Sequence, residues 1–250
     1  MKIIWEIEPK DIEKTHAFYN AHWNNPFVRK RIERNLERPN YNPSKSEFFE
    51  AMVACLLTTQ QRSGPESAVT RFINLKPSPL SYQECLAKTD LNKHVHEIIS
   101  NFGGLRRSSR IADEITTNLK RLEEGLWYKI FKKIEQIQKY QTVDSERSAA
   151  KFIDDSLKGF GPKQSRNLLQ SLSVAKFEIP IDSRITKWLN RFGFPVKLNA
   201  NALSDQHYYN FISDGIQTLC EQTGITPCVL DAVIFTSFDK GGWTEENVVW

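Results

Sequence analysis

The stretch Leu157-Lys158-Gly159-Phe160-Gly161-Pro162-Lys163 decides the fold of this chain, because it joins two helical patterns by a very short turn. The flanking helices are predicted over residues 145–156 and 163–172. Gly159 and Gly161 can adopt positive φ and leave backbone amides uncovered, while Phe160 between them is predicted to plug into the core. Amides at the start of a helix can hold a phosphate, although a helix-ending glycine explains half of the pattern equally well.

Lys163 and Asp182 are the candidate chemical residues. Lys163 lies in the first turn of the second helix, where the helix dipole disfavours a cation and so favours the neutral amine that nucleophilic attack requires. Asp182 follows the extended run 179–181 and is predicted to cap the next helix, 184–191, as an ionised carboxylate. Singly, each has a simpler interpretation, namely a solvent-facing lysine and an ordinary cap.

Working outward from the hairpin, the remaining elements are predicted to be helices, and the fold class is all-α. The chain length allows one large domain or two small helical lobes. The family resemblance given below implies two helical lobes flanking a cleft, with an N-terminal extension over 1–43, a six-helix-barrel-like lobe over 44–143, and the hairpin with C-terminal helices over 144–250. One short strand is predicted over residues 2–7. The other helical patterns cover 12–37, 44–57, 66–74, 82–88, 110–122, 126–137, 204–222 and 227–238.

Composition narrows the class of protein. The 250 residues include 34 Lys and Arg against 30 Asp and Glu, a mild basic excess that indicates no partner by itself. Basic residues gather at 29–34 and 106–110, either as a phosphate-binding surface or, as charge runs alone favour, as solvated helix faces. The early charges and the lack of a long apolar run predict a soluble, intracellular protein without a membrane partner. Four scattered cysteines predict reduced thiols.

The run 157–163 followed by Ile179-Pro180-Ile181-Asp182 resembles the signature of the helix-hairpin-helix/Gly-Pro-Asp superfamily of DNA glycosylases. The spacing from Lys163 to Asp182 is similar to that of the 8-oxoguanine branch. The resemblance implies a base-excision repair enzyme in which Lys163 attacks C1′ of an extruded nucleotide, expels the base and forms a Schiff base able to cleave the strand. Asp182 would support the sugar cation or the lysine. Lys163 therefore implies a bifunctional glycosylase and AP (β-elimination) lyase.

The resemblance also implies binding residues. The hairpin residues Lys158, Gly159, Phe160 and Gly161 would hold the DNA backbone, and Gln60 would fill the gap left by the extruded base, with Gln61 and Arg62 beside it. Exposed polar loop residues are an equally good interpretation of Gln61 and Arg62. It also implies that Arg184 is a phosphate donor, that Asn167, Phe235 and Phe238 line the base pocket, and that the carbonyls of Asp155, Leu157 and Phe160 hold a structural Na⁺ or K⁺. Core packing is the better interpretation of the two phenylalanines taken alone.

Two departures from the family pattern limit the assignment. Only Cys220 and Cys228 lie near the C-terminus, so no iron–sulfur cluster is expected, and no cofactor is needed for catalysis. Arg184 stands where many relatives have a phosphate-contacting His, and Asn167 is polar, so the damaged base is open. The leading substrate is 8-oxoguanine in double-stranded DNA, bound by a monomer in the cytoplasm (nucleoid) of a prokaryote or the nucleus of a eukaryote. The alternatives are a glycosylase for an oxidised pyrimidine or alkylated purine, or a noncatalytic hairpin protein.

Overall fold

The computed structural model describes residues 4–38, 41–199, 201–239 and 242–248, and within these ranges the chain is helical without a strand. None of the helices described is long and apolar enough to cross a membrane. The α-helices are α1 (Pro9–His22), α2 (Pro26–Asn35), α3 (Lys45–Leu57), α4 (Ala68–Ile73), α5 (Tyr82–Leu86), α6 (Leu91–Phe102), α7 (Ser108–Arg121), α8 (Trp127–Tyr140), α9 (Val143–Ser156), α10 (Pro162–Ser171), α11 (Ser183–Phe192), α12 (Gln206–Thr223) and α13 (Pro227–Ser237), with short helices η1 (Leu122–Leu126) and η2 (Ala202–Ser204).

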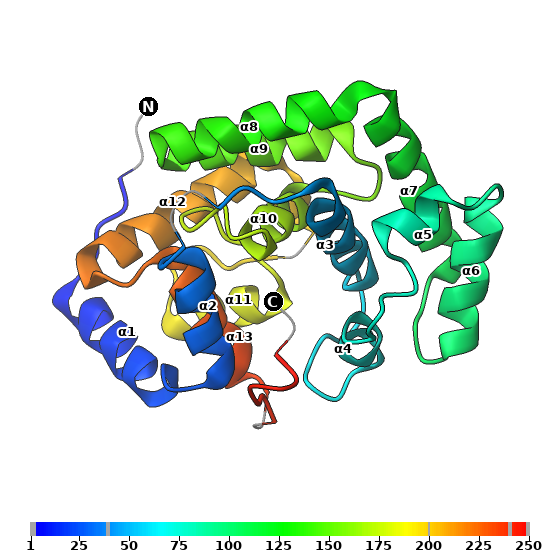
Figure 1. Ribbon diagram of the computed structural model, residues 1–250. Coiled ribbons are helices and arrows are strands. Elements are labelled where there is room, and N and C mark those ends of the chain that lie inside the picture. The colour runs from blue at the N-terminus through cyan, green and yellow to red at the C-terminus, as the bar shows by residue number, and fades with distance from the viewer. Residues whose placement is uncertain (1–3, 39–40, 200, 240–241, 249–250) are drawn as a thin grey trace.

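Two hydrophobic cores divide these helices into two lobes. The first core collects buried side chains from Phe48 to Ala175, so α3 to α10 share it. The second collects Phe27, Val28 and side chains from Ile179 to Trp243. Figure 1 shows α1 and α2, in blue, beside α12 and α13, in orange and red, and α2 and α13 are in contact. The N-terminal helices therefore complete the C-terminal lobe, and the hairpin shares the core of the other. The boundaries at 43 and 143 stay a prediction.

Helix starts follow the local sequence signals closely. Ser44 caps α3 and forms a capping box with Glu47, so α3 begins where the sequence predicts. Pro162 occupies the first turn of α10, where its missing N–H costs nothing. Asp182 caps α11 by accepting from two backbone N–H groups.

Two predicted elements need correction, and one helix was not predicted. The helix expected over 12–37 is two helices, because Asn25 caps α2 and Pro26 occupies its first turn. The strand expected over 2–7 is wrong for residues 4–7, which have no regular structure, and residues 2 and 3 lie outside the described ranges. Helix α6 was not predicted at all. It buries only Leu91, Val95 and Ile99, a narrow stripe among polar residues.

The basic cluster at 29–34 is divided: Arg29 is exposed, as expected of a solvated helix face, whereas two of the arginines are buried. Arg31 is buried and its Nη1 donates to Asp231 Oδ2 of α13 at 3.1 Å. Arg34 is also buried and its Nη2 donates to the Gln170 carbonyl at 3.3 Å. Burial lowers the pKa of Arg34 to about 9. These arginines hold α2 against α13 and the end of α10.

The four cysteines are buried, unpaired thiols. In both lobes burial raises the thiol pKa, to about 12 for Cys55 in α3 and to about 12 for Cys228 in α13. They therefore stay protonated at neutral pH. Within the described ranges, no group of three or more His, Cys, Asp or Glu residues is arranged to hold a metal ion.

Candidate active site

The hairpin between α9 and α10 has two glycines with different conformations. Gly159 has φ +84°, and a Cβ atom there would lie 2.6 Å from the carboxylate carbon of Glu114 in α7. Gly161 has φ −137°, an extended conformation open to any residue, and nothing lies within 4 Å of a Cβ built on it. The expectation of positive φ therefore holds for Gly159 only. Phe160 between them is 9% exposed and packs in the first core, as predicted.

Helix α7 clamps the hairpin from behind. Asn118 is fully buried, and its side chain accepts from Lys158 N at 2.7 Å and donates to the Lys158 carbonyl at 2.9 Å. Glu114, which faces Gly159, is itself held by Arg110 Nε at 2.8 Å. Asn118 and Glu114 were missed in the sequence because their partners lie some 40 residues away along the chain. Because both backbone groups of Lys158 are bound to α7, the protein itself holds this part of the turn in place.

Lys163 lies at the junction of α10 and the end of α3. Its Nζ donates to Gln164 Oε1 at 3.0 Å. Gln164 is buried, and its Nε2 donates in turn to the Cys55 carbonyl and to Thr59 Oγ1, both at 2.6 Å. One amide side chain thus joins the lysine to the loop that begins after α3. Sequence analysis missed Gln164.

Asn167, one turn further along α10, contacts two of the same residues, Cys55 and Gln164. Its Nδ2 donates to Cys55 Sγ at 3.3 Å and to Gln164 Oε1 at 3.5 Å. The structure therefore brings Asn167 and Lys163 together on one face of α10. The Cys55 thiol beside them is neutral, because burial raises its pKa to about 12, so it adds no second nucleophile.

Asp182 presents one oxygen to the backbone. Oδ1 accepts from Arg184 N at 2.8 Å and Ile185 N at 3.0 Å. Among the described residues Oδ2 has no hydrogen-bond partner, so it is available to a ligand. The carboxylate of Asp231 in α13 is a second acidic group in this region. Burial raises the pKa of Asp231 to about 6, Arg31 acts against this shift, and the negative charge of Asp182 adds to it.

Arg184 and the two phenylalanines lie against α13. The Arg184 guanidinium stacks over the Phe235 ring at 3.8 Å and its Nη2 pairs with Asp239 Oδ1 at 3.3 Å. Phe235 also stacks on Phe27, with ring centroids 4.8 Å apart. Phe238 is half-buried, with Arg191 above its ring at 5.6 Å. A base stacking on Phe235 would therefore compete with Arg184.

The three residues predicted in the loop after α3, Gln60, Gln61 and Arg62, differ in exposure and contacts. Gln60 is exposed and has φ +58°. Gln61 is half-buried and ties this loop to the chain before α7, since its Nε2 donates to the Leu57 carbonyl at 2.8 Å and its Oε1 accepts from Arg106 N at 2.7 Å. Arg62 is exposed. Gln60 and Arg62 are therefore open to solvent, whereas Gln61 holds the loop.

The alkali-cation site expected at the carbonyls of Asp155, Leu157 and Phe160 stays a prediction. In the hairpin the carbonyls of Ser156 and Lys158 are taken by Arg121 at 2.8 Å and Asn118 at 2.9 Å. The carbonyl of Leu157, which lies between them in the chain, accepts only a long hydrogen bond of 3.4 Å from Phe160 N. Hard oxygen atoms left over in a rigid turn suit Na⁺ or K⁺.

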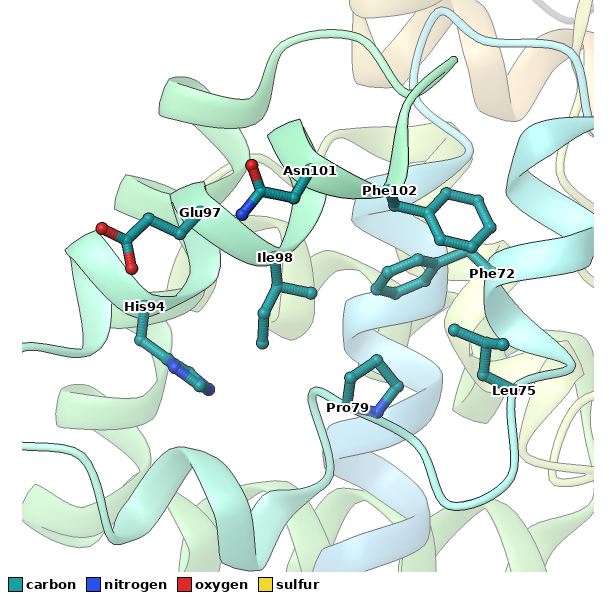
Figure 2. A pocket seen from close by; sticks show the side chains of 8 residues that line it. All are labelled: Phe72, Leu75, Pro79, His94, Glu97, Ile98, Asn101 and Phe102. Atoms are coloured by element: carbon teal, nitrogen blue, oxygen red, sulfur yellow. The ribbon is translucent and has the colours of Figure 1, made fainter.

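Lys163 and Asp182 come from different lobes. The part of the chain that the structure describes contains no ion pair between them, and each is held by its own neighbours. A hollow of about 450 Å³ lies elsewhere, between α4 and α6, and Figure 2 shows His94, Glu97 and Asn101 along its α6 wall. None of the predicted site residues lines it.

The chain has a two-lobed helical fold in which the hairpin is followed by a lysine in the first turn of α10 and by an aspartate at the start of α11. Among solved structures the chain is similar to the 8-oxoguanine glycosylase/lyase of Methanocaldococcus jannaschii in complex with a 15mer DNA containing 8-oxoguanine. The TM-score is 0.70 at 17% identity, over 93% of this chain and 99% of that one. The 8-oxoguanine DNA glycosylase of Thermotoga maritima gives 0.66 at 15% identity, over 94% and 99%. The fold is therefore that of 8-oxoguanine DNA glycosylases.

Sequence comparison reaches part of the chain. A curated 8-oxoguanine DNA glycosylase/AP lyase of Thermoplasma volcanium is 26% identical over 102 residues, which are 41% of this chain and 47% of that protein. The chain thus spans about half the length of the curated relative that it matches. No protein-family model matches the chain.

Proposed function

We propose that this chain is a base-excision repair DNA glycosylase with AP lyase activity that removes an oxidised purine, with 8-oxoguanine as its main substrate. The observation that carries the proposal is the place of Lys163, in the first turn of α10 directly behind the hairpin. The fold supports the proposal, because the two similar solved structures are those of 8-oxoguanine glycosylases.

The proposed chemistry is the attack of the Lys163 amine on a nucleotide that is turned out of the duplex. Nζ attacks C1′, the glycosidic bond breaks, and its electron pair leaves with the base, which takes up a proton. The C1′–O4′ bond then opens with proton transfer to O4′, while the nitrogen lone pair forms the C=N bond of a Schiff base. Loss of a C2′ proton expels the 3′ phosphate as the C3′–O bond breaks. Water finally hydrolyses the imine and restores Lys163.

Asp182 acts on charge rather than as a nucleophile in this proposal. Positive charge develops on the sugar as the glycosidic bond breaks, and a fixed carboxylate nearby lowers the energy of that state. The two backbone N–H groups on Oδ1 hold the carboxylate in place, and Oδ2 remains to face the sugar or the lysine.

The DNA-binding surface is proposed to consist of the hairpin and the loop after α3. Backbone amides at residues 159–161 and an alkali cation on the Asp155, Leu157 and Phe160 carbonyls bind the phosphates, with Lys158 beside them. Gln60 enters the gap left by the extruded base, and Arg62 contacts the backbone. Arg184 exchanges Asp239 for a phosphate, and Asn167, Phe235 and Phe238 line the base pocket. The enzyme acts on duplex DNA as a monomer.

Borohydride trapping tests this function. The protein is incubated with duplexes that each carry one lesion (8-oxoguanine, an oxidised pyrimidine or an alkylated purine), and borohydride reduces any Schiff base to a stable amine. We expect an adduct on 8-oxoguanine that disappears in Lys163→Ala. The control is Lys120→Ala, an exposed lysine of α7 whose Nζ lies 3.8 Å from Glu124 Oε1 and which has no part in the proposed site, and it should retain the adduct.

Each outcome of the trapping experiment has a defined meaning. An adduct on another lesion replaces the substrate and leaves the mechanism intact. DNA binding without an adduct on any lesion makes the chain a noncatalytic hairpin protein. Trapping that persists in Lys163→Ala contradicts the lysine mechanism.

A further inference from the structure

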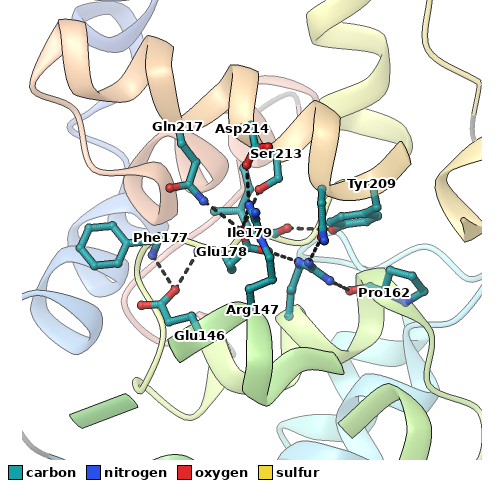
Figure 3. A network of polar contacts seen from close by, with 12 residues as sticks. Glu146, Arg147, Pro162, Phe177, Glu178, Ile179, Tyr209, Ser213, Asp214 and Gln217 are labelled. Atoms are coloured by element: carbon teal, nitrogen blue, oxygen red, sulfur yellow. Dashed lines mark hydrogen bonds and ion pairs between the residues drawn. The ribbon is translucent and has the colours of Figure 1, made fainter. Parts of the chain in front are cut away.

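Behind the site, a buried cation reaches from α10 into the other lobe. Arg166 is fully buried and its Nη1 donates to the Pro162 carbonyl, next to Lys163, at 3.0 Å. Its Nη2 donates to Asn210 Oδ1 in α12 at 2.9 Å, and its guanidinium lies over the Tyr209 ring at 4.2 Å. Figure 3 shows this network between the two lobes. Arg166 therefore fixes the first turn of α10 against α12.

Tyr209 continues the contact toward Asp182. Its ring is fully buried, its hydroxyl donates to the Ile179 carbonyl at 2.8 Å, and the hydroxyl accepts from Ile181 N at 2.6 Å. Pro180 between them has no N–H, so the extended segment depends on side chains for hydrogen bonds. One hydroxyl thus holds both sides of Pro180, directly before Asp182.

Glu178 supports the same segment from its other end. Its carboxylate is fully buried and accepts from Arg166 and from Arg147 of α9. Ser213 and Gln217 of α12 also donate to it, each at 3.0 Å. The carboxylate is fully paired, so the segment that begins at 178 is fixed where the two lobes meet.

We infer that Tyr209 is a positioning residue that, with Arg166, sets the place of the Asp182 carboxylate relative to the Lys163 amine. The inference rests on the proposed function. No ion pair joins the two side chains in the described part of the chain, so their separation is set by their supports. Arg166 holds the residue before Lys163, Tyr209 holds the residue before Asp182, and the two stack on each other.

Tyr209→Phe tests this inference, because it keeps the ring under Arg166 and removes only the hydroxyl. The control is Tyr82→Phe, which removes another buried tyrosine hydroxyl, the donor to Glu123 at 2.6 Å, from the first lobe. Single-turnover excision is measured at saturating enzyme on the lesion that the wild-type protein traps. Affinity is measured separately on a duplex with a tetrahydrofuran abasic site.

We expect Tyr209→Phe to lower the single-turnover rate by about tenfold or more, because small displacements of reacting groups slow chemistry strongly. DNA affinity should change less than about twofold, since this hydroxyl contributes no phosphate contact. Tyr82→Phe should lose comparable thermal stability while its rate stays unchanged. Equal rates in Tyr209→Phe and the wild type, or equal rate losses in the two variants, would overturn the inference.

A second measurement does not depend on activity. Hydrogen exchange of the Arg184 and Ile185 amides, which donate to Asp182, should be at least about tenfold faster in Tyr209→Phe than in Tyr82→Phe, because local opening limits such exchange. Unchanged exchange contradicts the inference even if the protein acts on no lesion. Faster exchange without trapping contradicts only the proposed function.

Discussion

Gly159 and Gly161 lie two residues apart in the hairpin and have different tasks. Gly159 combines a φ of +84° with a close approach to the Glu114 carboxylate, whereas Gly161 has an ordinary extended backbone and open space beside it. The first glycine is thus required by the protein's own packing. The second leaves room on the outer side of the turn, where a phosphate would approach.

Gly159→Ala should lower the free energy of unfolding by about 2 kcal/mol, through the left-handed backbone and the contact with Glu114. Urea unfolding measures the change. A loss below about 0.5 kcal/mol would show that α7 yields easily to the added methyl group.

Gly161→Ala should behave in the opposite way. Its stability should stay within about 0.5 kcal/mol of the wild type, because the methyl group meets nothing in the protein. Its affinity for duplex DNA, measured by fluorescence anisotropy, should fall by about tenfold if the backbone at this glycine approaches a phosphate closely. Unchanged affinity would place the phosphate elsewhere.

Sequence patterns predicted the local features of single residues and missed their distant partners. Pro162 and Asp182 occupy the helix positions expected of them, because capping and first-turn preferences act within a few residues. Gln164, Asn118 and Tyr209 are ordinary in sequence, since each acts on a segment far along the chain. The arginines at 31 and 34 were wrongly assigned to the surface for the same reason.

At the scale of elements, α7 acts as the support of the hairpin. Asn118 supplies both hydrogen bonds to Lys158 from a fully buried position. Helix α6, which packs on α7, escaped prediction because its buried stripe is only one residue wide. The amphipathic pattern therefore predicted helix α7, but it predicted neither the neighbouring helix α6 nor the support that α7 gives to the hairpin.

Asn118→Ala should lower the free energy of unfolding by about 2 kcal/mol, because it leaves two backbone groups unpaired. The amide of Lys158 should also exchange faster with solvent. Thr116→Val on the same helix is the control, since the Thr116 hydroxyl is buried without a partner among the described residues, and it should be neutral or slightly stabilising. Equal effects of the two substitutions would argue against a specific clamp.

At the scale of the whole molecule, two lobes meet around the segment 176–182. Glu146 of α9 accepts from the backbone N–H groups of Lys176, Phe177 and Glu178. The all-α class was predictable from helical periodicity, and the two lobes were expected from the family resemblance. How the N-terminal helices complete the second lobe was not, because that contact depends on side chains about 200 residues apart, such as Arg31 and Asp231.

The Glu146 carboxyl makes stability depend on pH. Burial raises its pKa from 4.5 to about 7, against the three N–H groups that favour the carboxylate. The folded state therefore holds this proton more tightly than the unfolded chain. Its stabilising contribution is complete below about pH 4.5 and is lost as pH rises through 7, by about 3 kcal/mol.

Thermal unfolding between pH 4 and 8 checks this prediction. The unfolding temperature of Glu146→Gln should decrease less with rising pH than that of the wild type. The decrease that is due to Asp231, whose pKa is raised to about 6, should remain. Glu135→Gln, an exposed position on α8, should follow the wild-type curve. Parallel curves for Glu146→Gln and the wild type would assign the pH dependence to other groups.

The burial of all four cysteines has a practical consequence for watching this protein at work. Thiols that are unexposed and protonated at neutral pH react slowly with maleimides, so the native chain gives little background labelling. A single cysteine introduced at Gln60, on the exposed loop after α3, would therefore carry a fluorophore alone. Its emission would test, one molecule at a time, the proposal that this loop enters a duplex.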